Sequence, residues 1–314
     1  MANQETKKLD EIISSRRAMM TMGGAALAGL FLTGVAKAQA ALTDNDILNF
    51  ALNLEYLEAQ FYSLAAFGVT IDKQPTPIPT APNASLGAAG TVTLKPGFAK
   101  VPFTNPPISD YATETAIEEG KHVTFLQGAL GSAAVSMPNI DLYNSFNALA
   151  MAAGIGPAFD PFDKDADFLV GAYIFEDVGV TAYHGAAAAI SSTSVLGAAA
   201  GILAVEAYHA GLIRTSINQL DAGSGALAGL TQKISATRAK LANPSGTPVD
   251  DIGLTTANVS LNGSANLPAT TFVDADANSV AFARTPAQII QIVTGGSSAN
   301  KGVFFPDGLN GTIK

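Results

Sequence analysis

The sequence predicts an all-α protein built on a four-helix bundle with a long crossover loop, a fifth helix and an irregular C-terminal extension. Three observations predict this class. Apolar residues recur at three- and four-residue steps in four long segments. Glycine or proline stands near the ends of these segments and interrupts them. Hydrophobic residues make up 48% of the chain and charged residues 14%, which suits a well-buried globular protein and argues against a disordered one.

The first forty residues are expected to be an export leader and not part of the fold. The pair Arg16-Arg17 precedes the uncharged, glycine-rich stretch from Ala18 to Ala36, and Ala38-Gln39-Ala40 has the small residues of a cleavage site. This arrangement resembles a twin-arginine signal peptide. The alternative is an uncleaved membrane anchor, but the glycines weaken the segment as a span. We therefore expect residues 1–40 to engage the twin-arginine translocase and the mature protein to be periplasmic or secreted.

Charge and cysteine content limit the partners of the mature chain. Removal of residues 1–40 leaves 12 basic and 23 acidic side chains, a net charge of −11. Such a surface repels nucleic acid and anionic lipid, so we expect neither as a partner. The chain contains no cysteine. Disulfides are therefore excluded, and any metal must be held by oxygen and nitrogen ligands.

The first two helices of the bundle are expected on either side of a long crossover. The first runs from Thr43 or Asp44 to about Phe67, and Gly68 ends it. Residues 68–108 contain eight prolines, which exclude a helix, and residues 91–94 and 99–103 can pair as a small hairpin. The second helix is expected from Ser109 or Asp110 to about Leu130. A bundle with one long connection is a known variant of the architecture.

The remaining elements follow from the same pattern of apolar steps and breakers. A short helix is expected over residues 141–153, and a loop-rich extension with a helical turn or two at 286–294 is expected to wrap the bundle. The predicted parts are the leader at 1–40, the bundle at 41–243 and the extension at 244–314. The later long helices are expected at about 165–190, 195–220 and 226–241, the last being a more polar fifth helix.

Two pairs of residues have the spacing of metal ligands. They are Glu119-x-x-His122 and Glu206-x-x-His209, and each falls in a segment predicted to be helical. Residues three apart on a helix share one face, so each helix would offer a carboxylate and an imidazole to one metal. With only nine glutamates and three histidines in the chain, two such pairs are well above chance.

The other two long helices each contribute a glutamate among apolar neighbours, Glu55 and Glu176. One glutamate from each of two helices and a Glu-x-x-His pair from each of the other two is the ligand set of di-iron and di-manganese bundles. We expect two metal ions, iron or manganese, with the Glu-x-x-His pairs as terminal ligands and the two single glutamates bridging or terminal. The predicted metal ligands are Glu55, Glu119, His122, Glu176, Glu206 and His209.

The order of these motifs over residues 55–209 resembles the ferritin superfamily, which includes bacterioferritin, rubrerythrin and manganese catalase. Glu55 with Tyr62 seven residues later is similar to the first helix of ferritins, and this register favours Glu55 over Glu58 as the ligand. Tyr62 is expected at the site as a hydrogen-bond donor or redox-active phenol. With the leader and the ending at 304–308, the pattern resembles exported bacterial ferritin-like proteins and plant desiccation-related proteins.

The resemblance implies a redox metalloprotein that reacts with oxygen or peroxide in oxidative or desiccation stress. The crossover at 68–108 and the tail after residue 243 would obstruct a 24-subunit cage, so any homo-oligomer is expected to differ from ferritin. The chain has no Cys-x-x-Cys pair, so it lacks the electron-transfer module of rubrerythrin. The alternative is a non-enzymatic stress-protective or envelope-associated scaffold whose metal site is structural or vestigial.

Several other residues are expected to have structural roles. His184 is eight residues past Glu176 and is expected to lie away from the site. The aspartate-rich stretches at 163–167 and 274–278 lack the glycine and glutamate of calcium loops, so we expect caps and turns there. The glutamates expected at the surface or rim are Glu58, Glu114 and Glu118. The aromatic residues expected in the core are Tyr56, Phe61, Phe125, Tyr173 and Tyr208.

Overall fold

A computed structural model describes residues 42–246, 250–259 and 267–314 of the chain. The predicted leader at 1–40 lies outside the described residues. The described part is mostly helical, with two small two-stranded sheets. It confirms the all-α prediction.

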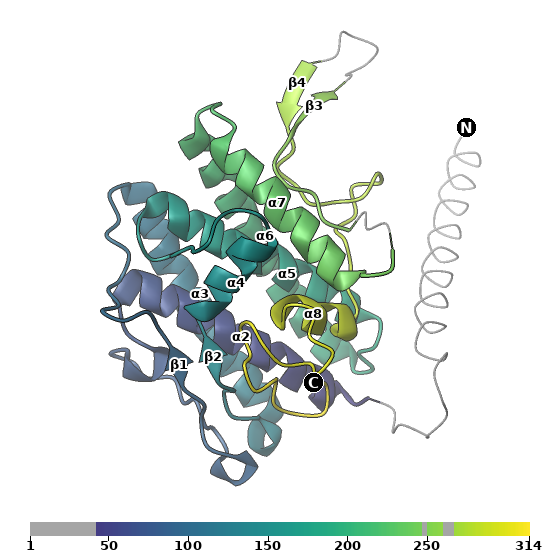
Figure 1. Ribbon diagram of the computed structural model, residues 1–314. Helices are drawn as coiled ribbons and strands as arrows, with labels where there is room; N and C mark the ends of the chain where they lie inside the picture. Colours follow the sequence, from purple (N-terminus) through teal and green to yellow (C-terminus); the bar gives the residue numbers. More distant parts are fainter. Residues whose placement is uncertain (1–41, 247–249, 260–266) are drawn as a thin grey trace, which may run out of the picture. The chain divides into compact units, whose positions relative to one another are not determined.

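Four long helices form the bundle (Figure 1). Helix α2 packs along α3, and α5 packs along α6. The two pairs meet through contacts of α2 with α5 and of α3 with α6. The bounds of the four helices are Asp44–Phe67 for α2, Pro106–Leu130 for α3, Asp165–Ala187 for α5 and Thr193–Asp221 for α6.

The ends of α2 and α3 follow from local chemistry. Thr43 and Asp46 form a capping box that satisfies free backbone N–H groups at the start of α2. Gly68 ends α2 with φ of 76°, a left-handed conformation that favours glycine. Helix α3 begins at Pro106, earlier than predicted. Proline was expected to exclude a helix there, but its fixed φ and missing N–H are compatible with the first helical position.

The crossover contains short 3₁₀ turns at Ile71–Lys73 and Ala84–Leu86 and the strand β1 (Val92–Thr93). The prediction of a hairpin within the crossover is wrong. Strand β1 instead pairs in parallel with β2 (Ile140–Asp141), which lies beyond α3 in the sequence. Gly90 permits this approach, since a Cβ there would overlap the backbone of residues 138 and 139.

The segment expected to be the hairpin's second strand packs elsewhere. The backbone N–H of Val101 donates to the carbonyl of Ala65 in α2, at 3.2 Å. The Val101 side chain is buried in the core. A tertiary contact with the bundle therefore replaces the local pairing that the sequence suggested.

Three further helices and a hairpin complete the described part: α4 (Asn144–Ala152), α7 (Ala226–Ala242), α8 (Pro286–Val293) and β3 (Thr256–Val259) paired with β4 (Leu267–Thr270). Helices α7 and α8 contact each other and α5. The hairpin was not predicted. The expected helices at 141–153, 226–241 and 286–294 are confirmed to within a few residues.

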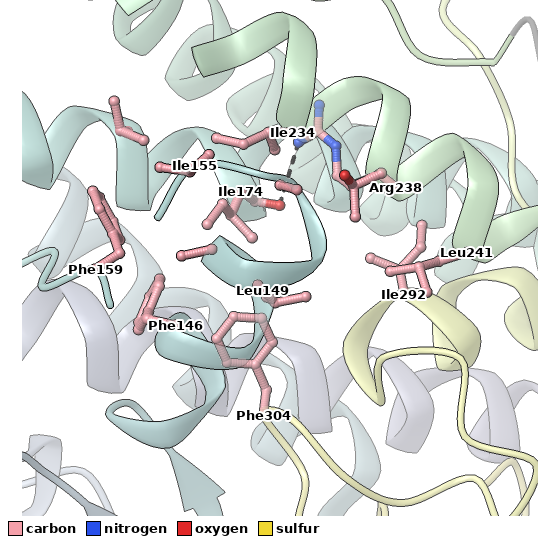
Figure 2. Close-up of a pocket in the computed structure, with 14 residues that line it drawn as sticks. Phe146, Leu149, Ile155, Phe159, Ile174, Ile234, Arg238, Leu241, Ile292 and Phe304 are labelled. Carbon is pink, nitrogen blue, oxygen red and sulfur yellow. Dashed lines mark hydrogen bonds between the residues drawn. The ribbon is translucent and has the colours of Figure 1, made fainter. Parts of the chain in front are cut away.

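A small apolar cavity of about 30 Å³ lies where α4, α7 and α8 meet (Figure 2). Phe304 of the C-terminal segment stands at its edge and contacts Phe146 and Phe175, with ring centroids 5.3 and 4.9 Å away. Arg238 reaches the other side and donates from Nη1 to the carbonyl of Ile174, at 3.3 Å. The lining is otherwise almost entirely apolar, so this cavity is a packing junction between extension and bundle.

Buried arginines join the extension to the bundle. Arg238 in α7 donates from Nη2 to Asp177 of α5 at 2.9 Å and to Asp251 of the extension at 2.7 Å. Arg214 in α6 donates from Nε to Asp177 at 3.0 Å. Arg284 donates from Nη2 to Asp251 at 2.9 Å. These five side chains form one network, in which each aspartate contacts two arginines.

Helix α6 has the length and mean hydropathy, 1.5, that a membrane-spanning helix would also have. It also carries Glu206, His209 and Arg214, all buried within the described part of the chain. Length and composition are therefore weak evidence for a span.

Two aromatic residues predicted to fill the core are exposed. Phe125 is 50% exposed and Tyr208 is 73% exposed. The inward positions on these turns of α3 and α6 are occupied by Leu126 and His209, and a residue adjacent in sequence points about 100° away. The other three predicted core aromatics, Tyr56, Phe61 and Tyr173, are buried as expected.

Candidate metal centre

The structure brings together all six predicted ligands in the interior of the bundle. None is more than 8% exposed. Each of the four long helices contributes, because the predicted residues lie on its inward face. The contributions are Glu55 from α2, Glu119 and His122 from α3, Glu176 from α5, and Glu206 and His209 from α6.

His122 marks one half of this buried cluster. Its Nδ1 lies 3.2 Å from Oε2 of Glu55, 3.4 Å from Oε2 of Glu119 and 3.4 Å from Oε1 of Glu206. One potential ligand atom from each of the four residues lies within 4.8 Å of those of the others. Four convergent donors of this type are sufficient to hold an iron or manganese ion.

His209 marks the other half. Its Nδ1 lies 3.0 Å from Oε1 of Glu119 and 3.5 Å from Oε2 of Glu176. The two oxygens of Glu119 therefore face different histidines. Glu55 and Glu176, expected to be bridging or terminal ligands, each approach a single histidine, whereas Glu119 is the carboxylate that could contact a cation in either half.

The inward-facing atoms fit a cation better than they fit one another. The Nδ1 atoms of both histidines lie close to carboxylate oxygens, but the geometry of these contacts is not that of hydrogen bonds. Leaving buried polar atoms unsatisfied is costly, and ligation removes that cost. Among the six predicted ligands, the buried atoms without a hydrogen-bond partner are Glu55 Oε2, both carboxylate oxygens of Glu119 and Glu206, Glu176 Oε2, and Nδ1 of His122 and His209.

The pKa values of the cluster show how strongly it attracts positive charge. Burial is the main cause that raises the pKa of Glu55 to about 7, although nearby His122 opposes this shift. Burial also opposes the charged form of His209, but Glu176 and Glu119 outweigh it and raise the histidine pKa to about 12. Both groups therefore bind protons more tightly in the folded metal-free protein than in the unfolded chain.

This proton uptake predicts how stability depends on pH. Raised pKa values in the folded state mean that Glu55 and His209 keep protons that the unfolded chain releases, so the free energy of unfolding of the metal-free protein should fall between pH 5 and 8. The Glu55 shift alone corresponds to roughly 3 kcal/mol. Because Mn²⁺ competes with these protons, the gain in melting temperature on adding Mn²⁺ should be larger at pH 8 than at pH 5. Thermal melts with EDTA or Mn²⁺ measure both trends, and a metal-free stability that rises over this range would contradict them.

Two tyrosines each hydrogen-bond a carboxylate of the facing helix. Tyr62 of α2 donates a hydrogen bond to Oε1 of Glu176 in α5, and Tyr183 of α5 donates one to Oε1 of Glu55 in α2. Each tyrosine follows the glutamate of its own helix by seven residues. Helices α2 and α5 are thus equivalent halves of the site. Tyr183 was missed in the sequence analysis, although its seven-residue spacing from Glu176 matches that of Tyr62 from Glu55.

Glu118 has a closer relation to the site than predicted. It is at the rim as expected, with its side chain 35% exposed. Its Oε2 lies 2.7 Å from Nε2 of His209, so the carboxylate accepts a hydrogen bond from the outer ring nitrogen. With Nε2 bonded to Glu118, Nδ1 is the ring nitrogen of His209 that is directed into the cluster. A carboxylate behind a histidine is a common way to orient a metal ligand.

The prediction that Glu58 lies at the surface or rim is wrong. Glu58 is 5% exposed, and a carboxylate oxygen lies within 4.8 Å of those offered by Glu176 and Glu206. It follows Glu55 by three residues, so both share the inward face of α2. Burial and the surrounding carboxylates raise its pKa well above the usual range.

The remaining candidates have the structural roles expected of them. Nδ1 of His184 lies 3.1 Å from the carbonyl of Phe282, away from the cluster, and Glu114 is exposed. Asp165 accepts a hydrogen bond from the backbone of Thr104 at 3.1 Å. Asp276 accepts bonds from the backbone of residues 278 and 280 within a turn.

The sequence model of the ferritin-like domain matches residues 43–219, which include the whole buried cluster. The chain belongs to the ferritin-like domain family. It is 31% identical over 257 residues to the desiccation-related protein PCC13-62 of Craterostigma plantagineum, covering 79% of this chain and 76% of that protein. It is 26% identical over 278 residues to the ferritin-like catalase Nec2 of Nesocodon mauritianus, covering 86% of this chain and 84% of that protein. No solved structure matches the chain.

Proposed function

We propose that this ferritin-like protein is an exported di-metal carboxylate protein that binds two iron or manganese ions and reacts with oxygen or peroxide. One observation carries the proposal. Carboxylate and imidazole atoms from four helices are buried around shared points and have no hydrogen-bond partners among the described residues. Two cations would satisfy these atoms.

Peroxide removal is the reaction that the similarities favour within this class. One relative is named a ferritin-like catalase. Disproportionation of hydrogen peroxide into water and oxygen needs no outside electron donor, because one peroxide molecule oxidises another. Metals held by this ligand set would supply the Lewis acidity and the change of oxidation state that the reaction requires.

The chain's own residues would position the ligands and keep water out. Tyr62 and Tyr183 fix the orientation of Glu176 and Glu55 through their hydrogen bonds. The ring of Tyr62 packs edge-on against Phe61 and Phe168, with centroids 5.1 and 5.9 Å away. These aromatic side chains are fully buried, so the hydrogen bond from Tyr62 to Glu176 lies away from water, where electrostatic interactions are stronger.

Metal content and turnover of protein purified from its native host test the proposal together. We expect close to two iron or manganese atoms per chain and consumption of hydrogen peroxide with release of oxygen. Removing the metal should abolish consumption, and restoring it should recover the activity. A metal content near zero in natively exported protein would contradict the proposal.

The second candidate is a stress-protective scaffold, favoured by the similarity to a desiccation-related protein. Metal would then serve only to hold the bundle. In that case substitution of Glu119 and His122 would lower thermal stability, and the wild-type protein would turn over neither oxygen nor peroxide. Catalytic peroxide consumption by the wild type therefore separates the two functions.

Export by the twin-arginine pathway, to the periplasm or to the outside of the cell, is part of the proposal. The pathway translocates folded proteins, so metal could be inserted before export. We expect Arg16→Lys together with Arg17→Lys to leave nearly all of the chain in the cytoplasm as uncleaved precursor. Cell fractionation with immunoblotting measures this. Lys7→Arg with Lys8→Arg is the matched control, and normal export of the Arg16/Arg17 variant would contradict the assignment.

A further inference from the structure

Glu58 differs from the other buried glutamates of the cluster in its electrostatic surroundings. Each of the others lies within 3.5 Å of a histidine nitrogen: Glu55, Glu119, Glu176 and Glu206. No histidine, lysine or arginine of the described residues forms an ion pair with Glu58. His122 and His209 can compensate the charge of the other four carboxylates, but neither histidine contacts Glu58.

The immediate neighbours of Glu58 are carboxylates. Its oxygen lies within 4.8 Å of oxygens of Glu176 and Glu206, each of which is 1% exposed. Oε2 of Glu58 and both oxygens of Glu206 are buried without a hydrogen-bond partner. Three converging buried carboxylates repel one another, and burial of each ion costs several kcal/mol unless an opposite charge joins them.

Glu58 makes the site asymmetric, because the equivalent position of α5 carries no carboxylate. Glu58 follows Glu55 by three residues, and Gly179 is the residue three after Glu176. A Cβ at position 179 would overlap the carboxylate of Glu206, so the glycine leaves the space that this carboxylate occupies. One half of the site thus has an additional carboxylate where the other half has only backbone.

We propose that Glu58 is a seventh protein ligand of the metal centre and binds the cation that Glu176 shares with His209. This inference rests on the proposed di-metal function. Four carboxylates balance the charge of two divalent cations, and Glu58 adds a fifth. It therefore increases the attraction of the site for cations and gives the position beside Glu176 three carboxylates, as many as surround His122.

Titration of the metal-free full chain with Mn²⁺, followed by calorimetry, tests the inference. We expect two Mn²⁺ per wild-type chain. Glu58→Gln should weaken binding at one position by at least about tenfold, since even the loss of an outer-sphere partner costs 10–100-fold in metal affinity. Glu114→Gln removes the same charge from an exposed position of α3 and should bind like the wild type.

A stability measurement separates ligation from a structural role. In the metal-free protein Glu58→Gln should raise the melting temperature, because it removes a buried carboxylate that has no compensating partner. A structural role predicts a lower melting temperature. If Glu58 is a ligand, Glu58→Gln should raise the stability of the metal-free protein and weaken its binding of Mn²⁺.

Other outcomes would overturn the inference in recognisable ways. Binding of Mn²⁺ by Glu58→Gln with wild-type affinity would show that Glu58 is no ligand, while two ions in the wild type would leave the proposed function standing. Three Mn²⁺ in the wild type and two in the variant would assign Glu58 to a separate third cation. A wild-type chain that binds neither Mn²⁺ nor anaerobic Fe²⁺ would contradict the proposed function as well.

Discussion

Glu119→Gln is expected to abolish metal binding at both positions of the cluster. Glu119 is fully buried, and its two oxygens face His122 and His209 at 3.4 and 3.0 Å. Each of the other predicted glutamates approaches one histidine only. Removing the shared carboxylate therefore affects both halves, and we expect Mn²⁺ affinity to fall by more than the roughly 100-fold upper range for loss of an outer-sphere partner.

The same substitution should also destabilise the metal-free protein. Burial by itself raises the pKa of Glu119, but its contacts with His122 and His209 outweigh burial and hold the pKa below the usual range. A depressed pKa contributes stability at pH values above the unfolded pKa. Calorimetric Mn²⁺ titration and thermal melts at pH 7 measure both effects, with Glu114→Gln as the control on the same helix. Two tightly bound Mn²⁺ in the Glu119→Gln variant would contradict this account.

Arg238→Met is expected to lower the free energy of unfolding by about 3–5 kcal/mol, the usual cost of breaking a buried ion pair from one side. Arg238 is 2% exposed and donates to Asp177 of the bundle and Asp251 of the extension. Its guanidinium also lies 4.7 Å from the ring centroid of Tyr173, which adds a cation–π contact. The substitution leaves both aspartates with one arginine each instead of two.

Loss of this arginine should also loosen the C-terminal extension. Denaturant unfolding at pH 7 measures the stability, and limited proteolysis should cut the variant after residue 243 sooner than the wild type. Arg238→Lys keeps the charge but not the planar fork of donors, so it should have an intermediate effect. Lys240→Ala on the exposed side of α7 is the matched control. A change below 1 kcal/mol for Arg238→Met would contradict the role of the network.

The helices of the bundle and the six clustered residues could be predicted because both depend on local sequence. Apolar steps and breakers placed α2, α5 and α7 with small errors at the ends. The spacing of Glu119 with His122 gave their shared face directly, since residues three apart on a helix are neighbours. The same rule implied that Glu58 shares the face of Glu55. Glu55 and Glu58 are therefore not alternatives, since both point inward.

Other features depend on which segments meet in three dimensions. The pairing of β1 with β2 joins residues 92–93 to residues 140–141, and no local pattern favours that partner over the adjacent residues 99–103. Exposure of Tyr208 follows from the inward orientation of His209, which only the site decides. The network around Arg238 combines α5, α6, α7 and the extension, so its members could not be grouped from sequence spacing.

Anomalous diffraction from crystals of the Mn²⁺-loaded chain tests the central claim most directly. Data collected on both sides of the manganese absorption edge locate the metal independently of any assumed ligand. The account predicts two anomalous peaks inside the bundle, one beside His122 and one beside His209, with Glu119 between them. Peaks confined to the protein surface, or none within contact of these residues, would contradict it.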